Sequence, residues 1–401
     1  MKMNIGTNGT GVTSSRDSGQ HGFGLVELMI SIAIGLVILA ALVALFVNSS
    51  RNNREMATAN SVIENGRFAI ELLESDIVHA GYWSTYVPDF DDPTRDDAPP
   101  VSTPVGAPPA LCEAYDPATW VTGTAVMNRL LGIPVQVFPA ADAVCAGVVE
   151  DVVEGTDVIV LRHAERCAPG TGSCAADDPG QPELFLQSSL CADEIDANPY
   201  VFGRTGAAPF DPPFELTRRD CVTPAEKRRF ASYIYYVRDH AVAPGDGIPT
   251  LVRSEFDRVD GVIGFQAPVP LIEGIDGIWF ELGVDNLSIT GDEVDNSEEV
   301  DWEDDDTKSR AVNRGDGVPD VYRRCDPACD QPADTLDLMN VTSVKLYVIA
   351  RSREATPGYT DTKTYVAGAA GDVGPFDDGF KRHLYTTTIR LPNISGRRER
   401  P

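Results

Sequence analysis

The sequence predicts an α+β protein in which one long N-terminal helix precedes a mainly antiparallel β-rich globular head with long loops. No proline occurs between residues 23 and 88, so the stretch 23–81 is compatible with one continuous helix. Short β-like runs separated by turn-rich segments follow it, without the alternation of strand and helix that marks a parallel sheet. With 401 residues, of which 42% are hydrophobic, the chain is large enough for a substantial core.

The first part of this helix, residues 23–47, is long enough and apolar enough to cross a bilayer. It contains one charged side chain, Glu27, close to its start. A carboxylate in the middle of the hydrocarbon costs about 2.5–3.5 kcal/mol even on lenient scales. A secretory signal peptide has a shorter apolar region and a small-residue cleavage site. Hydropathy alone therefore favours an uncleaved membrane anchor. Such an anchor does not explain why a carboxylate, Glu27, stands in the apolar segment.

The second part of the helix, residues 48–81, is predicted to be amphipathic. Its apolar positions recur in steps of three and four residues: Met56, Ala59, Ile63, Gly66, Ile70, Leu73, Ile77 and Ala80. Gly66 weakens this face by about 1 kcal/mol relative to alanine, and Gly81 is placed to end the helix as a left-handed cap. We expect the face to pack against the head, with a coiled-coil dimer as the alternative.

The rest of the chain divides into a Pro/Asp-rich loop, a β-rich head and a basic tail, at residues 82–110, 111–393 and 394–401. The strand candidates are residues 156–164, 231–240, 248–256, 275–285, 341–352 and 383–393. In the fourth of these, Glu281 and Asp285 are expected to point outward. The tail is expected to be solvated and frayed rather than a basic patch that binds nucleic acid.

The net charge of −28, from 61 acidic and 33 basic side chains, argues against nucleic-acid binding by bulk electrostatics, because such a surface repels phosphates. All eight cysteines follow the apolar run, which indicates disulfides in an oxidising compartment. They are Cys112, Cys145, Cys167, Cys174, Cys191, Cys221, Cys325 and Cys329. The short closures 167–174 and 325–329 are the easiest, and the pairing stays open. Zinc is the weaker alternative, since no CxxC pair occurs.

The N-terminal segment "GFGLVELMISIAIG" resembles the class III signal of type IV pilins and pseudopilins. The resemblance implies a leader of residues 1–22 that a prepilin peptidase removes between Gly22 and Phe23, after which Phe23 is N-methylated. Gly24 departs from the threonine that is common there. In the filament core, Glu27 would neutralise the terminal amine of a neighbouring subunit and set the axial register, because an unpaired buried charge costs several kcal/mol.

Residues 64–83 and the head segments "GTDVIVLRHA", "LIEGIDGIWFELGVD", "VTSVKLYVIARS" and "LYTTTIRLPN" resemble the PilW family of minor pilins. The family implies a pilin-like fold and a non-catalytic protein of a tip or priming complex. Its implied partners are other minor pilins, a tip adhesin, the major pilin, the prepilin peptidase and the inner-membrane assembly platform. The chain would span the inner membrane once before it joins the pilus at the cell surface, with its head in the periplasm or outside the cell.

Two alternatives stay open beside this prediction. A minor pseudopilin of a type II secretion system would have the same N-terminus. A membrane-anchored periplasmic enzyme or receptor would keep its leader. Catalytic signals are weak, since the sequence contains no G-x-S-x-G, HExxH or glycine-rich phosphate loop. His163 with Glu165 beside Cys167 is interpreted as a strand end next to a disulfide, and no cofactor is required.

The most acidic stretch, residues 283–324, contains "NRGDGVPD", which is similar to a calcium loop. The loop is incomplete, because Val312 and Arg314 stand where acidic ligands belong. The candidate calcium ligands are Asp285, Asp292, Asp295, Asp316 and Asp320. A solvated acidic loop is the interpretation that these residues favour, with calcium as the alternative.

Overall fold

The computed structural model describes residues 22, 24–88, 106–178, 183–195, 197–205, 213–259, 261–295, 298, 300–301 and 304–399. The chain divides between Ala57 and Thr58 into two compact units. One helix, α1 (Leu25–Ile77), supplies the described structure of the first unit and then continues into the second.

The first part of α1 is apolar on all sides, and its large apolar side chains from Leu25 to Val47 are exposed. Within the described residues, α1 is the one helix long and apolar enough to span a membrane. The predicted span of residues 23–47 agrees with this helix, which begins at Leu25. Phe23 lies outside the described residues.

The second part of α1 buries one face in the head unit, formed by Val62, Gly66, Ala69, Leu73 and Ile77. The predicted face was partly wrong. Met56 and Ile63 are 64% and 47% exposed, Val62 and Ala69 lie in the core, and Ile70 is partly buried against it. The helix ends at Ile77, and a turn leads to Gly81, whose φ of 74° confirms the left-handed conformation expected there.

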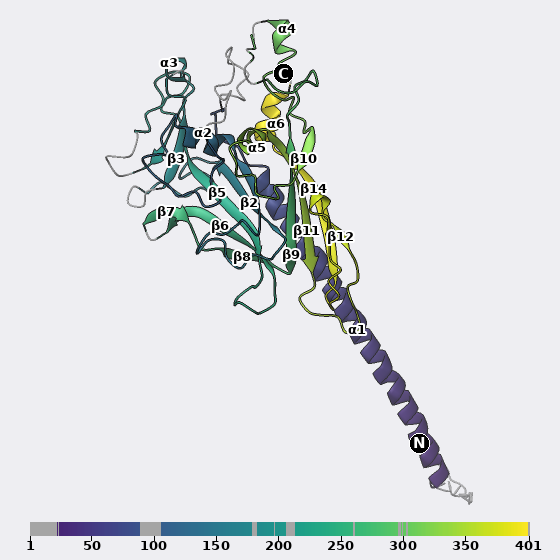
Figure 1. Cartoon of the computed structure of the whole chain (residues 1–401). Helices are drawn as coiled ribbons and strands as arrows, with labels where there is room; N and C mark the ends of the chain where they lie inside the picture. Colours follow the sequence, from purple (N-terminus) through teal and green to yellow (C-terminus); the bar gives the residue numbers. More distant parts are fainter. Residues whose placement is uncertain are drawn as a thin grey trace, which may run out of the picture. The chain divides into compact units, whose positions relative to one another are not determined.

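Two antiparallel sheets and several short helices form the rest of the head (Figure 1). The first sheet has the order β1-β2-β5-β3-β4, and β6 joins β5 to β7 and β8. Its strands are β1 (Val135–Pro139), β2 (Asp157–Ala164), β3 (Leu184–Ser188), β4 (Tyr200–Arg204), β5 (Lys227–Arg238), β6 (Thr250–Val259), β7 (Val262–Phe265) and β8 (Val269–Glu273).

The second sheet has the order β10-β9-β11-β14, and a two-stranded ribbon pairs β12 with β13. These strands are β9 (Ile275–Val284), β10 (Val321–Arg323), β11 (Val341–Arg351), β12 (Tyr365–Val366), β13 (Asp372–Val373) and β14 (Arg382–Arg390). The short helices are α2 (Ala125–Gly132), α3 (Ala192–Ile195), α4 (Asp305–Lys308), α5 (Asp334–Met339), η2 (Gly368–Ala370) and α6 (Pro392–Arg398).

All six predicted strands are present, as β2, β5, β6, β9, β11 and β14. The sequence missed the shorter strands, which lack a run long enough to show a period of two. The expectation that the tail from residue 394 is solvated and frayed was also wrong. Most of these residues belong to α6, where Ile394, Ser395 and Arg398 are buried.

The main core lies between the second part of α1 and both sheets. Apolar side chains of β1, β2 and β5 in the first sheet and of β9, β11 and β14 in the second join those of α1 in one cluster. Strand β9 contacts β2 and β5, so the two sheets meet along it (Figure 1).

Two acidic side chains on β9 and just after it contradict the expectation that they point outward. Glu281 is 8% exposed and accepts hydrogen bonds from the Tyr347 hydroxyl at 2.9 Å and from the Ala369 amide at 2.7 Å. Asp285 is fully buried. Both carboxylates stay inside because the tertiary structure supplies donors to them, which is the condition for burying a charge.

A glycine lets β14 approach α1 closely. A Cβ atom on Gly66 would lie 2.1 Å from Cε2 of Tyr385, and the Tyr385 hydroxyl points at the Val62 carbonyl from 3.4 Å. The tyrosine ring therefore occupies the space that any side chain at position 66 would need. Gly66 is therefore needed for packing against β14, although it lowers the helix propensity of α1 as the sequence suggested.

Replacing Gly66 tests this contact. Gly66→Ala gains about 1 kcal/mol of helix propensity but forces overpacking that costs about 1–3 kcal/mol, so we expect the free energy of unfolding to fall by about 1 kcal/mol. Urea denaturation of the full chain in detergent measures it. Gly396→Ala in α6 is the matched control, because a Cβ there meets nothing within 4 Å. Equal stabilisation by both changes would contradict the packing role.

Candidate functional site

The N-terminal motif forms the start of α1. Gly24 precedes the first helical residue, and its carbonyl accepts the amide of Leu28 at 3.1 Å. The Gly24 amide donates to Oε2 of Glu27 at 3.1 Å. Glu27 therefore occupies the third helical position and reaches back to the N-cap amide, as the glutamate of a capping box does. Its negative charge also lies at the positive end of the helix dipole.

This arrangement leaves Glu27 able to accept further donors. The side chain is exposed, and of its two oxygens only Oε2 has a partner among the described residues. Because no other charged residue occurs from residue 23 to residue 47, it is the one carboxylate that this apolar segment offers to a cation.

The structure gives no packing reason for the glycine at position 22. Gly22 is exposed, and a Cβ on it would meet none of the described atoms within 4 Å. Processing between Gly22 and Phe23 stays a prediction. The other half of the predicted cleavage site, Phe23, lies outside the described residues.

The C-terminal helix α6 fastens the end of α1 to the head. The Asn393 amide donates to the carbonyls of Val78 and Ala80 at 3.1 and 3.2 Å, and Arg397 donates to the Gly81 carbonyl at 3.1 Å. These bonds satisfy carbonyls of the turn that follows α1 and so fix its path into the head. The residues that the sequence suggested as a frayed tail therefore hold the point where α1 enters the head.

A buried ion pair holds α6 in place. Arg398 lies 3.1 Å from Asp285, and both side chains are fully buried. Burial raises the pKa of Asp285, although Arg398 and the Gly317 amide oppose the shift. The Asp285 carboxylate also accepts the amides of Asp316 and Gly317 at 3.1 and 2.9 Å, so it organises the acidic segment around it.

The other predicted calcium ligands also have structural partners. Asp320 accepts the amides of Asn286 and Leu287, Asp316 accepts the Val318 amide, and Asp292 accepts the Thr290 hydroxyl. In the part of the chain that is described, Asp285, Asp292, Asp295, Asp316 and Asp320 form no group of three whose ligand atoms lie within 4.8 Å of one another. Calcium binding by these residues stays the alternative to a solvated acidic loop.

The structure pairs all eight cysteines. The disulfides are Cys112–Cys145, Cys167–Cys174, Cys191–Cys221 and Cys325–Cys329. The two short closures that the sequence favoured are among them. Cys167 is thus unavailable as a nucleophile, and Glu165 pairs with Arg229 at 2.8 Å rather than with His163.

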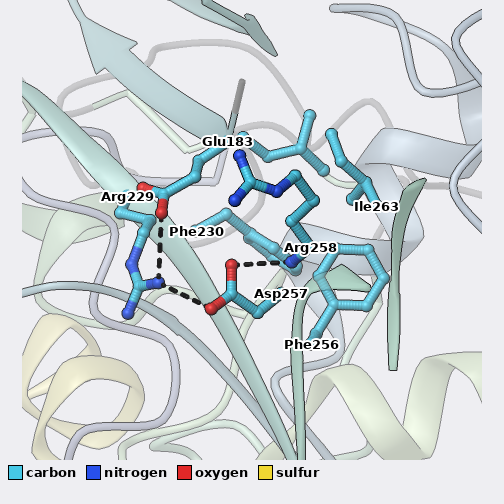
Figure 2. A pocket seen from close by; sticks show the side chains of 8 residues that line it. Glu183, Arg229, Phe230, Phe256, Asp257, Arg258 and Ile263 are labelled. Carbon is cyan, nitrogen blue, oxygen red and sulfur yellow. Dashed lines mark hydrogen bonds and ion pairs between the residues drawn. The ribbon is translucent and has the colours of Figure 1, made fainter. Parts of the chain in front are cut away.

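A small crevice lies beside this arginine (Figure 2). The Arg229 guanidinium lies 2.8 Å from Glu165, 3.4 Å from Asp257 and 3.8 Å from Glu183, while Phe256 lines the apolar side. Figure 2 shows the guanidinium between Glu183 and Asp257, with dashed lines to both. One guanidinium thus pairs with several carboxylates, which is typical of a structural ion-pair cluster.

His163 is buried where the end of α1 meets β2 and β5. Its Nδ1 faces the Ala164 carbonyl at 2.9 Å, and its buried Nε2 has no hydrogen-bond partner among the described residues. Burial lowers the pKa of His163, opposed by Asp76 and Glu165 and assisted by His79. The neutral ring packs against Tyr233, with ring centroids 5.5 Å apart.

This histidine predicts acid sensitivity. Because the folded pKa is depressed, the unfolded chain binds a proton first, and stability is lost as the pH falls below about 6.5. We expect the free energy of unfolding to decrease from pH 7 towards about pH 5, and His163→Gln to flatten that slope. Denaturant titration across this range measures it. His383→Gln, at an exposed histidine, should leave the slope unchanged; an equal effect would refute the prediction.

The Arg398–Asp285 pair makes a second prediction. Arg398→Met leaves the Asp285 carboxylate buried without its cation, and breaking such a pair costs about 3–5 kcal/mol. Chemical denaturation should show this loss. Arg397→Met, which removes a half-buried arginine bonded to a carbonyl, is the matched control with an expected loss of about 1 kcal/mol. Similar losses for both variants would argue against the buried pair as the fastening.

Two family models match the chain. Residues 234–393 match the model described as Type IV Pilus-assembly protein W, and residues 17–43 match the prokaryotic N-terminal methylation motif. Among solved structures, a type IV-like pilin from Thermus thermophilus is similar at 10% identity, over 83% of this chain and 97% of that chain, with a TM-score of 0.28. No curated protein matches the chain.

The two family matches cover different parts of the molecule. The methylation motif covers the residues around Gly22 and Glu27, and the second match runs from β5 to the start of α6. A membrane-length helix that carries a type IV pilin signal fits a membrane-anchored pilus component. The resemblance of the sequence to the PilW family of type IV pilus-assembly proteins is thereby confirmed over residues 234–393, on a chain with the N-terminal motif of a pilin.

Proposed function

We propose that the chain is a non-catalytic minor pilin that acts in a tip or priming complex of a type IV pilus. The observation that carries the proposal is the combination of a pilin methylation motif on a membrane-length helix with a head similar to type IV pilus-assembly protein W. The match to a pilus protein favours the pilus over a type II secretion system. The anchored enzyme or receptor is not favoured by any contact described above.

Glu27 would act twice in this function. In the chain with its leader, Glu27 caps the first turn of α1 through the Gly24 amide. Cleavage after Gly22 creates a new amine two residues before the helix start. In the low-dielectric interior of a filament, a charged amine needs a counterion. The exposed Glu27 of one subunit can supply it to the next and fix the axial register between them.

The head would provide the surface for other subunits. Its partners in this proposal are other minor pilins, a tip adhesin and the major pilin, with the prepilin peptidase and the inner-membrane platform acting earlier. The protein would start in the inner membrane and end on the pilus at the cell surface. Disulfides suit the oxidising side of that membrane.

Processing and assembly can be separated by two variants. Intact-mass measurement of the membrane-bound protein should give a chain that starts at Phe23 and is heavier by one methyl group, only when the peptidase is present. Gly22→Ala should keep residues 1–22 and prevent assembly. Glu27→Ala should be cleaved normally but fail to enter sheared pili, because the terminal amine lacks its counterion.

The outcome also separates the alternatives. A chain that keeps its leader both with and without the prepilin peptidase would contradict the pilin assignment. It would favour the anchored enzyme or receptor instead. Loss of exoprotein release with intact piliation, after deletion of the protein, would assign it to type II secretion. Glu27→Asp serves as the control for charge, since it keeps the carboxylate and should retain partial assembly.

A further inference from the structure

We propose that Asp151, Asp239 and His240 form a binding site for one divalent transition-metal ion of the zinc type, on the head and apart from the acidic segment of residues 283–324. The ligand atoms of these three side chains all lie within 4.8 Å of one another. His240 Nδ1 is 2.7 Å from Asp239 Oδ1 and 3.9 Å from Asp151 Oδ2.

The buried imidazole of His240 is the feature that most favours a metal site. His240 is only 5% exposed, and its Nδ1 lies within ion-pair distance of both carboxylates of the group. The Nδ1 edge of this buried ring therefore faces the two carboxylates of the group. Asp151 and Asp239 are about half exposed, at 51% and 59%. An ion can therefore reach the ligands from solvent while the ring is held from behind.

The two carboxylates lack a cationic side chain to balance them. Among the described residues, neither Asp151 nor Asp239 pairs with a lysine or arginine. The neighbouring Arg238 is engaged elsewhere, because its guanidinium donates to the carbonyls of His240 and Ala241 at 3.1 and 2.7 Å. Two like charges this close repel each other unless a cation lies between them.

The backbone holds the three ligands in a fixed relation. The amide of Asp239 donates to the Asp151 carbonyl at 2.9 Å, and the amide of Val153 donates to the Val237 carbonyl at 2.9 Å. On the other side, the Asp246 carboxylate accepts the amides of Ala241 and Val242. The ligands thus stand on two paired segments and a tightly bonded turn, a rigidity that a metal site needs.

The ligand types select the ion. Zinc binds imidazole nitrogen and carboxylate oxygen at about 2.0–2.2 Å, which places tetrahedral ligands about 3.4 Å apart. The His240–Asp239 separation of 2.7 Å is shorter than this value and the His240–Asp151 separation of 3.9 Å is longer. Zinc binding therefore requires the exposed Asp239 carboxylate to move away from the imidazole and the exposed Asp151 carboxylate to move towards it. Calcium prefers six to eight oxygens, and an imidazole ligand argues against it. The remaining coordination position is open to water or to a ligand from another protein.

A second group of similar residues shows the contrast. Cys191, Asp193 and Cys221 also lie within ligand distance, but the two cysteines are joined in a disulfide. Their sulfurs are therefore not thiolates, which are the form that binds metal. Asp193 is left as a lone exposed carboxylate, and it provides a matched control.

Zinc titration of the full-length chain in detergent tests the site, after treatment with a chelator and in competition with a chromogenic chelator. We expect one Zn²⁺ per chain. Asp151→Asn, Asp239→Asn and His240→Gln should each weaken binding about tenfold or more. Asp193→Asn and His383→Gln should leave the affinity unchanged.

Asp151→Asn distinguishes loss of a ligand from loss of the fold. Asp151 has a φ of 54°, and asparagine tolerates that left-handed conformation, so the fold should survive, as far-UV circular dichroism can verify. Co²⁺ in place of Zn²⁺ gives a visible absorption band that should change when His240 is replaced. A parent chain that binds no zinc, or one whose affinity all three variants retain, overturns the site. Neither result bears on leader cleavage or on pilus assembly.

Discussion

The fold of the head depends on burying one face of α1 between two sheets. Val62, Ala69, Leu73 and Ile77 are at most 5% exposed and belong to one core cluster with side chains from both sheets. The helix thus adds its apolar face to a core where the two sheets already meet along β9. Apolar burial contributes about 25 cal/mol per Å², so the large residues supply most of this energy, and the small ones determine how closely the strands approach the helix. Gly66 lets Tyr385 of β14 lie directly on the helix.

Arginines inside an acidic protein form the second constraint. Asp157, Asp285 and Asp361 are fully buried, and each pairs with an arginine: Arg324 at 2.7 Å, Arg398 at 3.1 Å and Arg382 at 3.2 Å. A buried carboxylate without such a partner costs several kcal/mol, so each pair fixes where two distant segments meet. In this way loops and the C-terminal helix become fixed parts of a rigid head. In the proposed function, these pairs would help the head to present fixed surfaces to neighbouring subunits.

In the proposed function, the Glu27 side chain has both a local structural role and a role in assembly. Glu27 satisfies an amide at the helix start, which is a local requirement, and keeps one oxygen without a partner among the described residues. The apolar residues around it offer no competing charge. A single carboxylate can therefore stabilise the first turn of the helix before cleavage and meet a neighbour's amine afterwards, without any rearrangement of the segment that carries it.

The sequence by itself determined the apolar span, the position of Glu27, the six longer strands and the resemblance to a pilus protein, because these depend on local periodicity and on contiguous motifs. Only the tertiary structure decided which helix face is buried, since Val62 and Ile63 are equally apolar and the sheets choose between them. It also decided the fate of the C-terminal residues. Arg398 is separated from Asp285 by 113 residues. Local sequence patterns therefore predict a solvated arginine, and only the folded chain brings its buried partner next to it.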